Sequence, residues 1–335
     1  MVLVCGDFFN GKEMVEGYLD TEEGIFHQGV EGRKEYTCIR APVNAHTHLG
    51  DSFIMDEPVG TLAEIVGPGG FKHTHLANTN VEKISQYMEE SIEFMKRSGT
   101  HIFFDFRETG NRARMTIETI RNHSDGIVLA RPENIEDFKK VLDIIHGIGF
   151  SAVSDMNMDY ARSLSEFAHK NGKIVASHFS ENRVESLENI GEIKPDFLVH
   201  CTALDKKQLM DLYQITENIA VTPRSNRFFN IESDYRKFLD NGFNLCLGTD
   251  NAMICLPDLF GEMEFLYRIQ KNVNRISPEE ILEMATINPY KMLETFHIEY
   301  REKWLCFKER EMTPYSIIRS SGKIPFIQIE ANPKI

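Results

Sequence analysis

The chain lacks the features of several special protein classes. Its 335 residues include one tryptophan and no Cys-x-x-Cys pair, and no uninterrupted apolar segment approaches the about 20 residues that a membrane-spanning helix needs. The first ten residues have no basic stretch before their short apolar run, so a secretory signal is not expected. We therefore expect a soluble, cytoplasmic protein without a membrane partner.

Cysteine and positive charge are both sparse. Six cysteines are scattered, mostly in apolar strand-like runs, as is typical of small buried side chains in a reducing compartment. The missing Cys-x-x-Cys pair also argues against the small zinc deaminases, whose signature requires one. Lys and Arg total 37 against 51 Asp and Glu, and the net charge of −14 disfavours nucleic acid as a partner. The expected partner is a small molecule, and a homo-oligomer is compatible with the sequence.

What is present is a regular alternation of strand and helix patterns. Apolar strand candidates recur about every 22 to 25 residues, the length of one strand with its crossover helix. They begin near His101, Gly126, Phe150, Lys173, Phe197, Asn218 and Phe243. Helix starts are marked by Asn80 before Val81 and by a capping box at Ser277-Pro278-Glu279-Glu280. A further strand at 39–46 brings the count to eight, which predicts an α/β fold with a (β/α)8 TIM barrel over residues 41–309.

The two ends of the chain have a different pattern. Residues 1–40 show short alternating runs separated by glycine and acidic residues, as antiparallel hairpins do. The C-terminal part is similar, with strand candidates at 315–318 and 324–329 around a Ser-Ser-Gly turn. We expect residues 1–40 and 310–335 to form one composite β-sandwich beside the barrel.

Residues 50–80 interrupt the alternation. The interval lacks clear periodicity and contains several Pro and Gly residues, and a connection of this length is more often a lid or binding loop than filler. It also contains a second His-x-His pair, His73 and His75. No strand-like segment leads into this pair, so we expect it to lie at the surface of the loop, with substrate contact as the alternative.

Metal-ligating side chains follow several of the expected barrel strands. His46 and His48 end the first strand, where a period of two puts both imidazoles on one face. His178 follows the fifth strand, His200 the sixth and Asp250 the eighth. A single His-x-His pair could be an accident of a surface strand. The C-terminal ends of barrel strands meet on one rim, however, so these four strand ends predict a shared site.

These residues also form an ordered set of motifs that resembles a known superfamily. The motifs are Asn44-Ala45-His46-Thr47-His48, His178-x-x-Glu181, His200 and Gly248-Thr249-Asp250. Together they resemble the amidohydrolase superfamily, in the branch of cytosine deaminase, S-adenosylhomocysteine deaminase, guanine deaminase and the chlorohydrolases. The resemblance covers essentially the whole chain. It implies one divalent ion, Zn²⁺ or Fe²⁺, bound by His46, His48, His178 and Asp250, and three neutral imidazoles with a carboxylate suit those metals better than Ca²⁺ or Mg²⁺.

The resemblance implies catalytic roles as well. Asp250 would accept a proton from the metal-activated water, Glu181 would protonate the ring nitrogen beside the attacked carbon, and His200 would hydrogen-bond the attacking water or the developing oxyanion. Two-metal members usually carry a carboxylated Lys at the end of strand four. The fourth strand expected here, residues 151–156, contains none, which favours a single metal, although Asp155 lies at that place.

Substrate contacts are less sharply indicated. The candidates are charged or amide side chains at strand ends: Arg107, Glu108, Arg131, Arg224, Asn226 and Asn251. Three rim arginines in an acidic protein indicate a substrate with an anionic or strongly accepting group, because Arg offers fixed donors. Each arginine could equally form a salt bridge within the rim.

The expected function is a metal-dependent hydrolase that acts on C–N bonds other than peptide bonds and releases ammonia from a small aminated N-heterocycle, such as a purine, pyrimidine, pterin or nucleoside-like compound. Glu181 favours deamination, because an aromatic C–NH₂ carbon resists attack until its neighbouring nitrogen is protonated. An ordinary residue in a first helical turn is the alternative for Glu181. The rival functions are a cyclic amidohydrolase similar to imidazolonepropionase and a chlorohydrolase-like enzyme. A non-catalytic interaction protein fits least, since relatives of that kind lose metal ligands.

Overall fold

The larger of two sheets is parallel and curls on itself. A computed structural model of the chain describes residues 3–22, 25–29, 31–107, 113–308, 312–319 and 326–330. The sheet has nine strands in the order β12-β11-β10-β9-β8-β7-β6-β5-β13. Its strands are β5 (Val43–His48), β6 (Ile102–Arg107), β7 (Ile127–Ala130), β8 (Gly147–Phe150), β9 (Ile174–Phe179), β10 (Phe197–His200), β11 (Asn218–Val221), β12 (Asn244–Leu247) and β13 (Asp250–Asn251). Because β12 pairs with β11 and β13 pairs with β5, the segment 244–251 contacts both ends of the order, which is consistent with the predicted TIM-like barrel.

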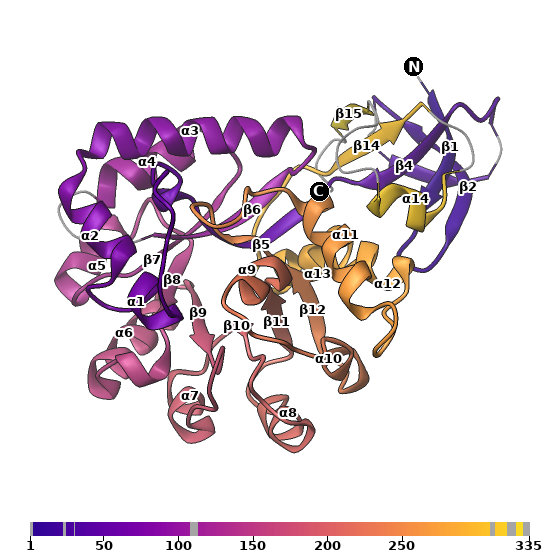
Figure 1. Cartoon of the computed structure of the whole chain (residues 1–335). Coiled ribbons are helices and arrows are strands. Elements are labelled where there is room, and N and C mark those ends of the chain that lie inside the picture. The colour runs from indigo at the N-terminus through magenta and orange to yellow at the C-terminus, as the bar shows by residue number, and fades with distance from the viewer. Residues whose placement is uncertain are drawn as a thin grey trace.

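Helices follow the strands, and most of them lie outside the curled sheet (Figure 1). They are η1 (Leu49–Asp51), α1 (Leu62–Val66), α2 (Phe71–Asn78), α3 (Val81–Arg97), α4 (Ala113–His123), α5 (Ile135–Val141), η2 (Val153–Asp155), α6 (Met158–Lys170), α7 (Leu187–Ile193), α8 (Lys206–Leu212), α9 (Pro223–Phe228), α10 (Arg236–Asp240), α11 (Leu259–Gln270), α12 (Pro278–Thr286) and α13 (Asn288–Thr295). Both predicted helix starts are confirmed: the Asn80 side chain accepts from the backbone N–H of Lys83, and Ser277 and Glu280 form a capping box.

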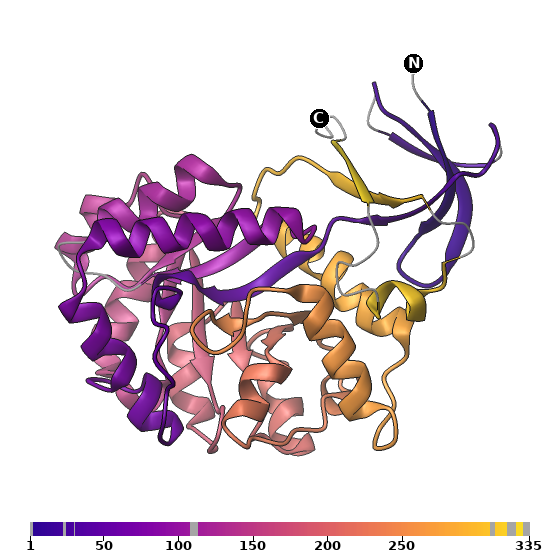
Figure 2. The ribbon, with the colours of Figure 1, turned by 45° about the horizontal axis from the view of Figure 1, so that its top comes forward.

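The smaller sheet joins strands from the two ends of the chain (Figure 2). One of its strands, at 303–307, lies inside the range 41–309 that the sequence analysis assigned to the barrel. Its six strands, in order, are β15 (Phe326–Glu330), β14 (Lys303–Phe307), β4 (Tyr36–Arg40), β1 (Leu3–Phe9), β2 (Met14–Asp20) and β3 (Ile25–Gln28). A sandwich is not confirmed, because the described strands at the two ends form this single sheet. The prediction of a strand at 315–318 is wrong. These residues belong to α14 (Pro314–Ile318), which starts at a capping box between Thr313 and Ser316 with Pro314 in its first turn.

Two other predictions from the sequence are corrected by the structure. The fourth barrel strand is β8 at 147–150, and residues 153–155 form η2 instead. The strand was missed because glycine occupies two of its four positions and is not typical of strands. Glycine is required at 149, since a Cβ there would lie 2.4 Å from the ring of Phe106. The interval 50–80 is not a plain loop but contains η1, α1 and α2, with His73 and His75 on α2.

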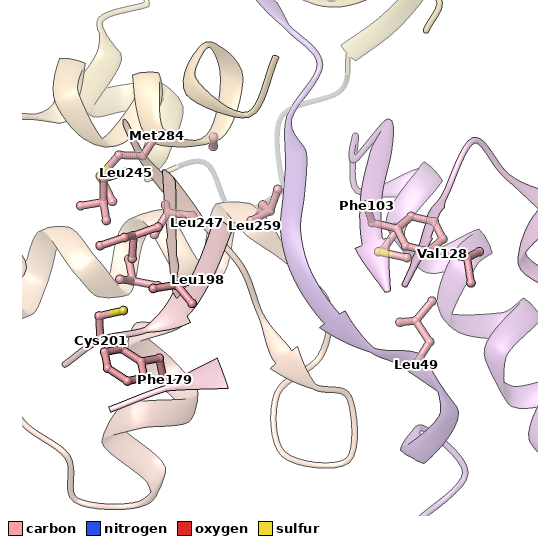
Figure 3. Close-up of a cluster of buried hydrophobic side chains, with 14 of the residues drawn as sticks. Leu49, Phe103, Val128, Phe179, Leu198, Cys201, Leu245, Leu247, Leu259 and Met284 are labelled. Carbon is pink, nitrogen blue, oxygen red and sulfur yellow. The ribbon is translucent and has the colours of Figure 1, made fainter. Parts of the chain in front are cut away.

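The strands bury apolar side chains on both faces. Phe104 and Phe106 of β6 belong to a cluster with Ala176 and Val199, on the face that α13 also contacts. The alternate residue Phe103 belongs to a larger cluster between the strands and the surrounding helices, part of which is drawn in Figure 3. Burial on both faces is expected of a parallel sheet covered by helices. None of the helices in the described part of the chain is long and apolar enough to cross a membrane.

A half-buried histidine makes the stability of the fold depend on pH. Nδ1 of His146 accepts a hydrogen bond from the backbone N–H of Val128 at 3.0 Å, and burial, assisted by the charges of Arg121 and Lys173, lowers the pKa of His146 to about 4. Between about pH 6.5 and pH 4 this side chain is protonated in the unfolded chain but not in the folded chain. The free energy of unfolding therefore decreases by about 2–3 kcal/mol as the pH falls through this range. In His146→Asn, which keeps an acceptor, we expect this part of the fall to disappear. Urea unfolding at pH 7 and pH 4.5 measures it, and equal falls in both proteins would contradict the assignment.

Candidate metal and catalytic site

A bulge at the end of β5 turns two histidines into the site. Val43 and Asn44 pair with Ile102 and Phe103 of β6, but Thr47 pairs with Asp105, so β5 contains one extra residue between Asn44 and Thr47. Without this residue, strict alternation from the interior-facing Val43 would point His46 and His48 outward. With it, the ring of His46 lies 4.4 Å from the ring of interior Phe106.

The four predicted metal ligands lie together at the strand ends. Nε2 of His46 is 3.3 Å and Nε2 of His48 is 3.6 Å from Oδ1 of Asp250. Nε2 of His178 is 3.2 Å from Nε2 of His48. The ligand atoms of His46, His178 and His200 also lie within 4.8 Å of one another. Strands β5, β9 and β13 therefore bring three imidazoles and one carboxylate to one point.

Contacts outside this set fix its geometry. Nδ1 of His178 lies 2.7 Å from the backbone oxygen of Phe150, so Nδ1 carries the proton and Nε2 presents its lone pair to the site. A Cβ at Gly248 would lie 2.7 to 2.9 Å from atoms of His46, so only glycine permits β12 and β5 to approach this closely. Asn44 completes the junction, since its Nδ2 donates to Thr249 Oγ1 at 2.8 Å and its Oδ1 accepts from the Thr249 N–H at 3.1 Å.

The donor set fits a divalent transition metal. Both ring nitrogens of His46 and Nδ1 of His48 are buried without a hydrogen-bond partner among the described residues. A buried polar atom left unpaired costs about 1–3 kcal/mol, and a cation at Nε2 of His46 would relieve part of that cost. Imidazole nitrogens with a carboxylate oxygen are typical ligands of Zn²⁺ and Fe²⁺. His46, His48, His178 and Asp250 are the residues that could hold such an ion.

Burial gives these groups the protonation states that metal binding requires. The pKa values of His48 and His178 are lowered well below the ordinary value, first by burial and then by nearby positive charges, so both rings are neutral. Burial raises the pKa of Asp250, but the His46 and His200 rings and the hydroxyl of Ser225 outweigh it and hold the pKa below its usual range. The Ser225 hydroxyl donates to Oδ2 of Asp250 at 2.6 Å.

The pKa of the second carboxyl group of the site, Glu181, is shifted in the opposite direction from that of Asp250. Burial, and then the negative charge of Asp250, raise the pKa of Glu181 well above its ordinary value, which favours the neutral acid. Burial lowers the pKa of His200 to about 4, and Nε2 of this neutral ring lies 3.5 Å from Oε2 of Glu181. The alternative of an ordinary first-turn residue is wrong for Glu181, because the next helix begins only at Leu187. Glu181 thus places a carboxyl group whose neutral form is favoured beside the metal-ligand set.

Two of the site residues have strained backbones. His200 has φ 72° and Asp250 has φ 65°, in the left-handed region that non-glycine residues rarely adopt. Each such residue costs of order 1–3 kcal/mol, and such conformations are concentrated at functional sites. The strain turns both side chains away from the alternation of their strands and toward the site.

A cavity of about 370 Å³ opens beside these groups. His48, His178, Glu181, His200 and Asp250 line its inner end. The volume lies in the range of about 300–1,000 Å³ that is typical of small-molecule sites. A small ligand bound in this cavity would lie beside the candidate metal ligands and Glu181.

One wall of the cavity was not predicted from the sequence. Lys72 of α2 lines it, is only 4% exposed, and places Nζ 3.7 Å from Oδ2 of Asp51. Asp51 in turn accepts from Asn251 Nδ2 at 2.7 Å and from the Met253 N–H at 3.1 Å. Burial raises the pKa of Asp51 to about 6, against the lowering effect of Lys72. The sequence offered no periodic pattern that could have identified Lys72.

The predicted substrate contacts lie in different surroundings. Arg131 and Asn251 line the cavity. The guanidinium of Arg107 is buried in an ion pair with Asp105, and Nε of Arg224 pairs with Oε2 of Glu262 at 2.5 Å. Asn226 does not line the cavity and bonds to Glu181 and His200 instead. Glu108 lies outside the described residues, and substrate roles for the six residues stay predictions.

The second His-x-His pair remains apart from the metal-ligand set. His73 lines the outer part of the cavity, and its Nδ1 accepts from the backbone N–H of Gly69 at 3.0 Å. Nδ1 of His75 lies 4.0 Å from Oδ2 of Asp56. Neither belongs to a group of clustered ligands in the described chain.

The sequence matches a known protein family. The model of the amidohydrolase family matches residues 41–297. The chain belongs to this family. It is 30% identical over 326 residues to an uncharacterized protein of Methanocaldococcus jannaschii, covering 87% of this chain and 85% of that protein. It is 26% identical over 284 residues to the 5'-deoxyadenosine deaminase of Methanothrix thermoacetophila, covering 74% of this chain and 68% of that enzyme.

Solved structures share the fold of this amidohydrolase. An adenosine deaminase from Xanthomonas campestris with bound zinc has a TM-score of 0.77 at 14% identity, covering 99% of this chain and 92% of that one. Atrazine chlorohydrolase from Arthrobacter aurescens, complexed with zinc, has a TM-score of 0.75 at 13% identity, covering 92% and 87%. The family match over residues 41–297 confirms the resemblance that the motifs indicate, and these structures agree with it in fold.

The metal-ligand assignment can be tested by substitution. We expect His178→Ala to lose stoichiometric Zn or Fe, because the removed Nε2 is one of the four donors held at the rim. Elemental analysis of the purified proteins measures the metal content. The matched control is the double variant of His73→Ala and His75→Ala, which should keep the metal. Loss of metal from this control, with retention in His178→Ala, would place the metal elsewhere.

Proposed function

We propose that this amidohydrolase is a hydrolytic deaminase of a small aminated N-heterocycle, working with one divalent ion on a closed (β/α)8 barrel. The observation that carries the proposal is that the carboxyl groups of Glu181 and Asp250 line one cavity beside the metal-ligand set, with the Oε2 atom of Glu181 3.5 Å from Nε2 of His200. Their surroundings raise the pKa of Glu181 and hold the pKa of Asp250 below its usual range. Two carboxyl groups held in opposite protonation states supply an acid and a base at the same pH. Hydrolysis of an aromatic C–NH₂ bond needs both.

The metal-ligand set supports the nucleophile side of this reaction. A divalent ion held by His46, His48, His178 and Asp250 would lower the pKa of bound water to about 7 and so supply a nucleophile at neutral pH. Asp250 is ionised and can accept the proton of that water. The Ser225 hydroxyl holds Oδ2 at 2.6 Å, which fixes the direction of the carboxylate.

Glu181 and His200 support the electrophile side. The carboxyl of Glu181 lines the cavity, and its neutral form can protonate a ring nitrogen of the substrate, which makes the neighbouring carbon electrophilic. His200 is neutral and can hydrogen-bond the attacking water or the developing oxyanion. When the tetrahedral carbon collapses, Asp250 passes the proton taken from water to the departing amine, and ammonia leaves. The hydroxyl proton of the intermediate returns to Glu181, and the ring nitrogen keeps the proton that Glu181 delivered.

The relatives and the cavity support a nucleoside-like substrate. One relative carries the name 5'-deoxyadenosine deaminase, and several structures with the same fold are deaminases of purine compounds. The cavity wall carries Lys72 and Arg131 beyond the metal-ligand set. Such cations favour a substrate with anionic or accepting groups at a distance from the reacting ring.

Two rival reactions use the same scaffold. A cyclic amidohydrolase would produce a new carboxylate without ammonia, and a chlorohydrolase-like enzyme would release chloride. The fold shared with atrazine chlorohydrolase keeps the second rival open. The zinc-loaded protein should therefore be incubated with a panel of aminated purines, pyrimidines, pterins and their nucleosides, with ammonia, chloride and titratable acid measured in parallel. Release of chloride or acid without ammonia would overturn the deaminase proposal.

The Glu181→Gln variant tests the proposed acid role of Glu181 separately from metal binding. The amide keeps the shape of the carboxyl but cannot deliver a proton, so we expect unchanged metal content and a fall in kcat of about 10²- to 10⁴-fold. In the wild type, kcat/KM should fall as the pH rises through the raised pKa of Glu181, since the deprotonated carboxylate is no longer an acid. This alkaline limb should be absent in the variant. Full activity of Glu181→Gln would remove the proposed acid role.

A further inference from the structure

We propose that Asn226 is a positioning residue that sets the tautomer of His200 and the direction of Glu181, and that Tyr235 orients its amide. Asn226 belongs to α9, directly after β11, and its backbone N–H donates to the Thr222 carbonyl at 2.9 Å. It is fully buried and does not line the cavity, so it acts through other residues. Its catalytic consequence rests on the proposed function, whereas its effect on His200 does not.

One amide group holds both catalytic side chains. Nδ2 of Asn226 lies 3.2 Å from Oε1 of Glu181 and 3.3 Å from Nδ1 of His200. An amide NH₂ can only donate, so its two hydrogens satisfy these two acceptors at once. The bond to Oε1 leaves Oε2 of Glu181 as the oxygen that faces His200 and the cavity.

The same bond decides where the imidazole proton lies. Because Nδ1 of His200 accepts from Asn226, the neutral ring carries its proton on Nε2. The hydroxyl of Thr222, 3.3 Å from the same Nδ1, can donate as well. Nε2–H then points toward Glu181 and the metal-ligand set, where a hydrogen-bond donor can stabilise negative charge on an attacking oxygen. In the other tautomer a lone pair would point there and repel that charge.

Tyr235 keeps the amide in the orientation that this arrangement requires. Its hydroxyl donates to Oδ1 of Asn226 at 3.1 Å, and the side chain is 1% exposed. Burial raises the pKa of Tyr235, so the hydroxyl keeps its proton. If the amide turned over, Oδ1 would face Oε1 of Glu181 and Nδ1 of His200, and each of these two atoms would have to carry a proton in order to bond to it.

The first test reads the tautomer without any substrate. In zinc-loaded protein labelled with ¹⁵N-histidine, with His200→Gln used to assign the signal, we expect His200 to show a protonated Nε2 and an unprotonated Nδ1. Asn226→Asp replaces the donor by an isosteric acceptor, so the proton should move to Nδ1. A protonated Nδ1 in the wild type, or the same tautomer in both proteins, would overturn the proposal.

The second test uses a compound that the ammonia panel identifies as a substrate. Asn226→Ala should lower kcat by about 100-fold with KM changed less than about 3-fold and with full metal content, since the lost positioning acts on the chemical step. Tyr235→Phe should lower kcat by about 10-fold alone but by less than about 2-fold in the Asn226→Ala background, as expected for two residues in one pathway. Independent effects that multiply would overturn the role of Tyr235.

A matched control separates positioning from folding. Tyr290 is also fully buried, and its hydroxyl donates to the carbonyl of Ala41 at 2.8 Å, at the opposite end of β5 from the metal-ligand set. Tyr290→Phe removes a similar hydrogen bond and should leave kcat within about 2-fold of the wild type. A loss equal to that in Tyr235→Phe would indicate a general effect of unfolding. If no panel compound is deaminated, the proposed function fails, while the nitrogen spectra still decide the assignment of Asn226.

Discussion

The site depends on one constraint, which is that ionisable side chains are kept close together out of water. Oδ1 of Asp250 lies within 3.6 Å of Nε2 on both His46 and His48, and all of them are buried. Such a group is unfavourable in a low-dielectric interior unless a cation or a proton compensates it. The bulge in β5, the glycine at 248 and the left-handed backbone of Asp250 serve this approach. The barrel holds a geometry that a flexible loop would relax.

The same burial acts in opposite directions on the two carboxyl groups. Asp250 has imidazoles and a hydroxyl donor around it, which stabilise the charged form more than burial destabilises it. Glu181 has one amide donor and faces the charge of Asp250, so the neutral acid is favoured. The environment therefore shifts the pKa values of two groups of similar intrinsic pKa in opposite directions, as the proposed roles of base and acid require. The distribution of donors, rather than the residue types, makes this difference.

The sequence predicted the elements that repeat, and it missed those that do not. Strand ends such as His178 and Asp250 could be found because a barrel collects its strand termini on one rim. The fourth strand could not be located, because Gly147 and Gly149 leave no apolar pattern where neighbouring side chains need the space. The bulge could not be predicted either. A period of two puts His46 and His48 on the same face of the strand, but it does not say whether that face points into the barrel or out of it. Register is a property of the pairing with β6 and not of β5 alone.

Rim arginines illustrate the limit of reasoning from residue type. Arg107 pairs with Asp105, whose Oδ1 accepts from the Leu49 N–H at 2.7 Å and from Thr47 Oγ1 at 3.0 Å. That ion pair thus supports the chain directly after His48. Because the pair is buried, removing one partner would leave an unpaired charge and destabilise the site, rather than weaken substrate binding directly. Lys72 shows the opposite case, because a helix in the irregular interval 50–80 brings it to the cavity wall. Through Asp51 and Asn251 this wall is connected to β13, the strand of Asp250. The cavity wall at α2 and the strand of Asp250 therefore belong to one connected structure. A substitution at Lys72 must preserve the position of Asp250 as well as the shape of the cavity.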